Sequence, residues 1–155
     1  MVRHIKIVVC LAFSMQAVNG STFNSDGPPK LATYTADSLG NLTTKSTRFN
    51  MLATAVQNLT EIWMSPSGKL LAVGGTAGLQ VFHFNGSNPI THYTGLLTKD
   101  EIDQFFWDND NHLYAISHAA GKLFVYTITP TSVSQAPGSP YSITDSRNII
   151  VLPKK

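Results

Sequence analysis

The chain has 155 residues, the size of one ordinary domain with room for a sizeable core. Only 13% of the residues are charged and the formal net charge is +2, so the composition argues against a nucleic-acid surface and against a helical protein with charged faces. Polar turn residues combined with few charges favour an all-β protein.

The first twenty residues have the layout of a secretory signal peptide. Basic Arg3 and Lys6 precede an apolar run from Ile7 to Val18, and small residues follow around Gly20. The run is too short to span a bilayer as a helix, so we expect no membrane span. The sequence predicts a secreted protein, or one of the periplasm or cell surface. A second interpretation stays open, in which the same run is a buried first strand.

Two further features belong to this N-terminal region. The only cysteine, Cys10, lies inside the apolar run, so a chain cleaved near Gly20 would hold no thiol and form no disulfide. Residues 21–30 are predicted to be a linker between the signal peptide and the folded part.

The most informative feature of the remaining chain is an internal repeat. Residues 61–73 align with residues 104–116 without a gap at a separation of 43 positions, apolar with apolar and turn with turn. After one inserted residue the match resumes, with Leu79 and Val81 facing Leu123 and Val125. A period in the low forties made of short strands is the signature of a β-propeller blade.

Two shorter similar segments extend the repeat toward both ends of the chain. Residues 31–42 align with residues 79–90, and residues 148–153 align with residues 61–66. The sequence therefore predicts a partial β-propeller of about two and a half four-stranded antiparallel blades. We expect a half blade over 31–60, whole blades over 61–100 and 101–147, and a final closing-type strand over 148–153.

Turn residues rich in Gly, Pro, Asn and Asp divide each whole blade into four strands. The predicted strands are Glu61–Ser65, Leu70–Gly74, Gly78–Phe84 and Ile90–Leu96, followed by Ile102–Trp107, His112–Ser117, Lys122–Thr129 and Ser132–Gln135. The second strand of each blade is apolar on both faces, which is typical of a strand between two neighbouring blades. The third strands alternate more clearly, as outer strands would.

Aromatic residues recur at equivalent places in the repeat. They are expected to fill the space between blades rather than to stack on a ligand. This set includes Trp63, Phe82, Phe84, Phe105, Phe106, Trp107, Tyr114, Phe124 and Tyr126.

A partial ring leaves apolar blade faces and strand edges uncovered. Propellers have about four to eight blades, and one repeat cannot bury both of its faces alone. Three interpretations stay open: the tail of a longer protein, a ring assembled from several copies, or a truncated remnant. The expected partners are accordingly other copies of this chain or the missing blades.

The segments SPSGKLLAVGGTAGLQVFHF (65–84) and WDNDNHLYAISHAAGKLFVYTI (107–128) resemble blades of seven-bladed lactonase-type propellers, the 6-phosphogluconolactonase-like and YVTN-type proteins. The phrase Ala136–Tyr141 is similar to the connector between blades of exported bacterial members. The resemblance implies a parent fold with ligands near a central channel and, in the family's enzymes, hydrolysis of a sugar lactone. None of the family's functional motifs transfers residue by residue.

Lactone hydrolysis needs a general base and a donor for the developing oxyanion. Asp100, Glu101 and Asp103 directly precede a predicted inner strand, so their carboxylates could face a channel mouth; the alternative is a solvated loop. His118 lies in a turn, where a polar residue is expected in any case. These four are the catalytic candidates of the sequence.

The alternating acids and amides at Asp108–Asn111 invite a test for calcium. The segment lacks the glycine and the ligand positions of an EF-hand and takes the place of a strand reversal in the repeat, so it is predicted to be a turn. The sequence has no zinc spacing, no nucleophile elbow and no phosphate loop. We expect neither a metal nor a cofactor.

These observations lead to a functional hypothesis. The sequence predicts an exported binding or scaffold module without self-sufficient catalysis. The resemblance implies a sugar or sugar lactone as a ligand, whereas the residues themselves do not identify one. The alternative is a sugar-lactone hydrolase that is active only in a complete ring.

Overall fold

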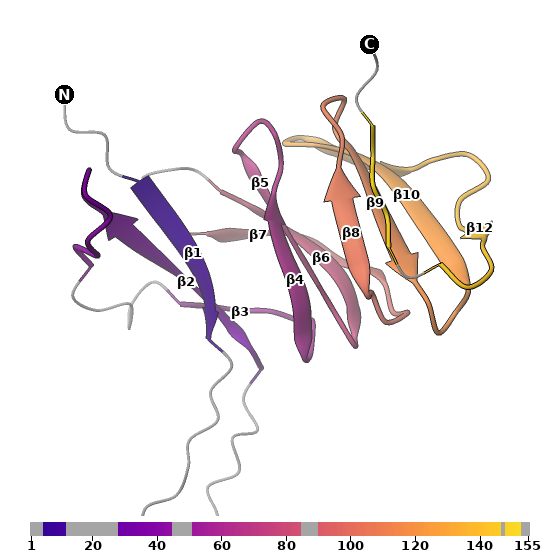
Figure 1. The fold of residues 1–155 in the computed structure, drawn as a ribbon, viewed down its shortest axis with the longest axis horizontal. Coiled ribbons are helices and arrows are strands. Elements are labelled where there is room, and N and C mark those ends of the chain that lie inside the picture. The colour runs from indigo at the N-terminus through magenta and orange to yellow at the C-terminus, as the bar shows by residue number, and fades with distance from the viewer. Residues whose placement is uncertain (1–4, 12–27, 45–50, 85–89, 147, 153–155) are drawn as a thin grey trace, which may run out of the picture.

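The computed structural model of the chain describes residues 5–11, 28–44, 51–84, 90–146 and 148–152. Every regular element in these ranges is a β-strand, and the strands form three antiparallel sheets. The sheets follow one another from left to right in Figure 1, each packed against the next. The structure thus confirms the all-β fold and the arrangement of a partial propeller.

The N-terminal sheet has the strand order β1-β2-β3, with β1 at Ile5–Leu11, β2 at Lys30–Ala36 and β3 at Leu52–Ala53. The central strand β2 is the strand that the repeat predicts for the half blade. Its partner β1 lies within the predicted signal peptide. Here this segment is a strand, as in the alternative interpretation of the apolar run. The removal of this segment during export stays a prediction.

The two whole blades have the predicted order. The first contains β4 (Leu59–Met64), β5 (Leu70–Gly75), β6 (Gly78–His83) and β7 (Thr91–Thr98), and the second contains β8 (Gln104–Trp107), β9 (His112–Ser117), β10 (Lys122–Thr129) and β11 (Ser132–Gln135). Each strand pairs with the next in the chain. The predicted boundaries are confirmed within two residues, and those of the last three strands coincide with the structure.

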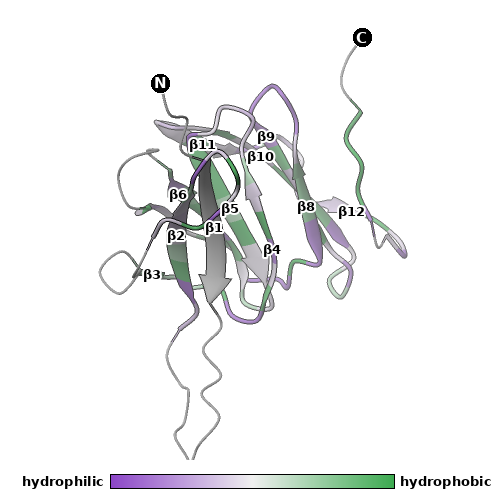
Figure 2. Cartoon of the chain, turned by 60° about the vertical axis from the view of Figure 1, so that its left-hand side comes forward, coloured by the Kyte–Doolittle hydropathy of each residue, from purple (hydrophilic) through white to green (hydrophobic). Residues whose placement is uncertain are grey.

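Two apolar cores fill the spaces between the three sheets. On one face of β5, Leu71 and Val73 pack with Leu31 of the N-terminal sheet. On the other face, Leu70 and Ala72 pack with side chains of the second blade. Figure 2 shows these hydrophobic strands inside the stack of sheets. Burying one large apolar side chain stabilises the fold by roughly 1.5–3 kcal/mol, so the contact between blades holds the chain together.

The predicted alternation of the third strand is wrong for β6. All its residues except His83 are buried, because β7 covers its edge and neighbouring sheets cover both of its faces. The prediction for the aromatic residues is confirmed at most positions, since Phe82, Phe105 and Tyr126 are buried. It is wrong for Trp63, which is 47% exposed.

The C-terminal part differs from the prediction in two ways. A short strand, β12 (Tyr141–Ser142), pairs with the start of β10 after the connector. The predicted closing strand is not formed, because residues 148–152 belong to no strand. This segment runs beside β8 (Figure 1), where the backbone N–H of Ile149 donates to the side chain of Gln104 at 2.7 Å instead of to a strand backbone.

The described residues include no helix of the length and apolar character needed to cross a membrane.

Candidate functional site

The first strands of the two blades, β4 and β8, contact each other and end in equivalent turns. In the first turn, Ser65 Oγ accepts a hydrogen bond from the backbone N–H of Leu70 at 3.1 Å. In the second, Asp108 Oδ1 accepts from the backbone N–H of His112 at 2.8 Å. One side chain per turn thus holds the chain reversal, and Asn111 adopts a φ of 66° to complete the second turn, as predicted.

Asp108 has a second oxygen that the repeat does not require. Its Oδ2 accepts from His112 Nδ1 at 2.7 Å and from the Tyr114 hydroxyl at 3.2 Å. A carboxylate oxygen can only accept, so Nδ1 of His112 carries the hydrogen and Nε2 of the neutral ring keeps a lone pair. The His112 side chain is 36% exposed, which leaves its ring accessible.

The surroundings of Asp108 change two pKa values. Partial burial raises the pKa of Asp108, but the hydrogen bonds from His112 and from the backbone of Asp110 outweigh it, so the pKa lies below its ordinary value. Burial, followed by the negative charge of Asp108, raises the pKa of Tyr114. At neutral pH the site therefore contains an ionised Asp108 and a neutral tyrosine.

An aromatic pair lies beside this polar group. Trp63 on β4 and Phe106 on β8 are equivalent in the repeat, and their ring centroids are 5.9 Å apart. Glu61 orients the pair, because its Oε1 accepts from Trp63 Nε1 at 2.5 Å and its Oε2 accepts from the backbone N–H of Phe105 at 2.7 Å. Glu61 thus joins the two blades and fixes the indole ring.

Two hollows flank the turn at Asp108. The first has a volume of about 330 Å³ and is lined by Trp63, Met64, Pro66, Phe106, Trp107, Asp108, Asn109 and Val151. The second, of about 420 Å³, is lined by Asp108, Asn109, Asp110, His112, Tyr114, Val151 and Leu152. Both volumes lie in the range of small-molecule sites.

One buried donor, on a residue that lines the first hollow, lacks a partner. Among the described buried side chains, only Trp107 Nε1 has no hydrogen-bond acceptor. Leaving a buried donor unpaired costs about 1–3 kcal/mol, so this atom lowers the stability of the core between the blades.

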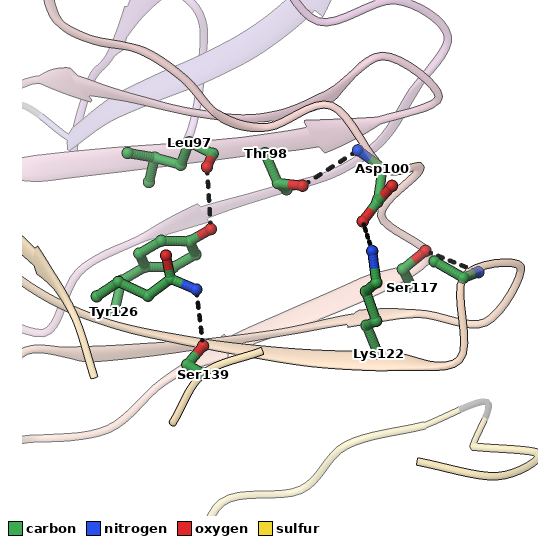
Figure 3. A network of polar contacts seen from close by, with 9 residues as sticks. Leu97, Thr98, Asp100, Ser117, Lys122, Tyr126 and Ser139 are labelled. Atoms are coloured by element: carbon green, nitrogen blue, oxygen red, sulfur yellow. Dashed lines mark hydrogen bonds and ion pairs between the residues drawn. The ribbon is translucent and has the colours of Figure 1, made fainter. Parts of the chain in front are cut away.

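The residues proposed from the sequence lie at the opposite end of β8. Asp100 forms an ion pair with Lys122 at 2.9 Å, as Figure 3 shows. Asp103 accepts from the backbone N–H of His118 at 2.7 Å, so the structure brings these two residues together through the main chain of a turn. Glu101 is exposed. Asp100 and Asp103 thus hold loops in place, and a catalytic role for the four residues stays a prediction.

Sequence reasoning assigned packing or turn roles, and no role in binding, to the residues that the structure gathers at the other end. The signal was the alternation along the first strands, which puts Glu61 and Trp63 on one face and repeats at Gln104 and Phe106. Within the described ranges, no three His, Cys, Asp or Glu side chains are grouped as a metal site would require.

The chain shows no significant match to any protein-family model, curated protein or solved structure.

Proposed function

We propose that this chain is an exported, lactonase-like β-propeller repeat module that binds a sugar or sugar lactone where β4 and β8 end, without catalysis of its own. The observation that carries this proposal is the half-exposed ring of Trp63, held beside Phe106 by Glu61 at the edge of a hollow. The lactonase-like and exported parts rest on the sequence patterns alone.

The side chains of the site suit a hydroxylated ring. An exposed indole offers a large, rigid apolar face, against which the C–H face of a sugar ring can pack. The exposed amide of Asn109, which lines both hollows, can donate to or accept from a hydroxyl or carbonyl oxygen. A ligand with one apolar face and several hydroxyl groups would satisfy both.

The hydrogen bonds that the carboxylates of Glu61 and Asp108 accept favour ligand binding over catalysis. Both oxygens of Glu61 and both oxygens of Asp108 already accept hydrogen bonds from donors in the fold. The lowered pKa of Asp108 also makes it a weak base. These two groups therefore act by orienting their neighbours.

The proposal is tested by titrating the purified chain with glucono-δ-lactone and with gluconate while tryptophan fluorescence is recorded. Trp107 is buried and Trp63 is exposed, so we expect the ligand to protect Trp63 from a soluble quencher. Trp63→Ala should abolish binding, whereas Trp63→Phe should retain part of it.

The matched control is Tyr141→Ala, which removes an exposed aromatic residue outside both hollows. Saturable binding that survives Trp63→Ala, or that Tyr141→Ala weakens equally, would refute the proposed site. The export proposal has a separate test: the mass of protein recovered from a secreting host should correspond to a chain beginning near residue 21.

A second function is favoured by one observation, the hydrogen bond between Asp108 and His112. In a complete ring, Nε2 of His112 could accept a proton from water as the water oxygen attacks the lactone carbonyl carbon. The ring C–O bond would then break, and the proton would pass from His112 to the departing alkoxide oxygen. Hydrolysis of glucono-δ-lactone above the spontaneous rate, lost in His112→Gln, would establish this function in place of simple binding.

A further inference from the structure

The N-terminal sheet lacks one of the four strands of a whole blade, since no described residue occupies the position of the first strand. The whole blades place their strands in chain order from first to fourth. In the N-terminal sheet, β2 corresponds to the third strand β6, because residues 31–36 align with residues 79–84. β1 therefore takes the second place and β3 the fourth. The free edge of β1 is where a first strand would pair.

The register supports this assignment. Leu31 pairs with Cys10, as its equivalent Leu79 pairs with Gly74, and Tyr34 pairs with Ile7, as Phe82 pairs with Leu71. Residues 7–10 thus take the place of residues 71–74. Both are runs of apolar or small residues, which is the composition of a second strand in this chain.

The chain also contains a first-strand segment with no place in a sheet. Residues 148–153 align with residues 61–66 of β4, yet residues 148–152 pair with no strand. The apolar side chains of Ile150 and Leu152 are 81% and 83% exposed. An extended, unpaired segment with exposed apolar residues is suited to pairing with an open sheet edge.

The vacant position is in the N-terminal sheet, whereas the unpaired segment lies beside β8 of the second whole blade. The blade β4–β7 stands between them (Figure 1). We propose that residues 148–152 of one copy add to the free edge of β1 in a second copy, as the first strand of its N-terminal sheet. The occupant of this edge is thus a second copy of the same chain.

The repeat fixes the expected register. Glu61 pairs with Gly74 in the first blade, so its equivalent Asn148 lies opposite Cys10 of the second copy. Trp63 pairs with Ala72, so Ile150 lies opposite Val8. This inference is independent of the proposed ligand. It concerns the full chain before any cleavage near residue 21, because it requires residues 5–11, which form β1.

Cys10 is the only natural cysteine, so the register can be tested by cross-linking. The full chain carrying Asn148→Cys is oxidised under mild conditions and run on a non-reducing gel, and the linked peptides are identified by mass spectrometry. We expect a disulfide between residue 10 of one copy and residue 148 of another. Adjacent residues of a strand face opposite sides of the sheet, so Ile149→Cys is the matched control and should not form this link.

A second measurement does not depend on cysteine chemistry. The unmodified chain should sediment as an oligomer, and Ile150→Asp combined with Leu152→Asp should reduce the mass to that of one chain. Leu39→Asp changes an equally exposed leucine outside this segment and should leave the oligomer intact.

Three results would overturn the inference. The first is a monomeric full chain at every concentration, and the second is equal linking by Asn148→Cys and Ile149→Cys. The third is a disulfide between residues 10 and 148 of the same molecule, which would show that the segment completes its own sheet.

Discussion

Tyr126→Phe tests whether the two whole blades are joined as the structure shows. Tyr126 on β10 is 3% exposed, and its hydroxyl donates to the backbone carbonyl of Leu97 on β7 at 3.1 Å (Figure 3). Phenylalanine keeps the ring and its packing but leaves this carbonyl without its donor. We expect the free energy of unfolding to fall by about 1–2 kcal/mol at pH 7.

The same tyrosine gives a second, pH-dependent readout. Burial, followed by the negative charge of Asp100, raises the pKa of Tyr126 from 10.0 to about 12. Below pH 10.0 this tyrosine is protonated in both folded and unfolded chains, so its contribution to stability is complete. As pH rises from 10.0 to about 12, the unfolded chain ionises first. The free energy of unfolding then falls by up to about 1.4 kcal/mol for each pH unit.

The assay is urea unfolding followed by tryptophan fluorescence, at pH 7 and at intervals through the alkaline range. Tyr93 and Tyr114 also have raised pKa values and titrate in both proteins, so the difference between wild type and Tyr126→Phe isolates Tyr126. Tyr141→Phe is the control, because its hydroxyl donates to the Pro137 carbonyl at 2.8 Å from an exposed position.

Two outcomes would refute this reasoning. One is that Tyr126→Phe costs no more stability at pH 7 than Tyr141→Phe does. The other is that the alkaline loss of stability is identical in wild type and Tyr126→Phe, since the variant lacks the group to which we attribute part of that loss.

Three further predictions concern packing and charge. Gly78→Ala should destabilise the chain by about 3 kcal/mol or more, because φ at this residue is 123° and a Cβ would lie 1.9 Å from the Thr98 carbonyl oxygen. The control is Gly95→Ala, because a Cβ at that position would have no atom within 4 Å. It should change stability by less than about 1 kcal/mol in the same urea assay. Phe105→Ala removes a fully buried ring from the core between the blades and should cost about 3–5 kcal/mol; retention of the wild-type urea midpoint would contradict that packing. The lowered pKa of Asp108 contributes stability that is complete above the ordinary value of 3.8 and is lost as pH falls through the lower, folded-state pKa. Asp108→Asn should therefore lose less stability than wild type on acidification below 3.8, and parallel acid curves for the two proteins would disprove this assignment.

Much of the fold could be predicted because local chemistry repeats along the chain. Turn residues bound each strand, and an apolar run such as Leu70–Val73 is stable only when both of its faces are covered. These constraints act within a few residues, so the β10 and β11 boundaries could be predicted to the residue. The period of 43 positions then identified which strands are equivalent.

The candidate site could not be predicted in the same way, because it depends on which strands become neighbours. Trp63 and Phe106 are distant in sequence, and both resemble core aromatics until the two first strands lie side by side and leave the indole half exposed. The pairing of Asp108 with His112 is local, but its importance comes from the hollows on both sides of the turn.

The sequence alone determined the class of the fold and the extent and order of the strands in the two whole blades, because alternation, turns and the repeat are local properties. Tertiary structure alone decided that Ile5–Leu11 pairs with β2, that residues 148–152 stay outside every sheet, and that Glu61 binds across to the next blade. The physical reason is that strand partners and exposure depend on the free energy of burying a whole face, and that free energy is set by elements far apart in the chain.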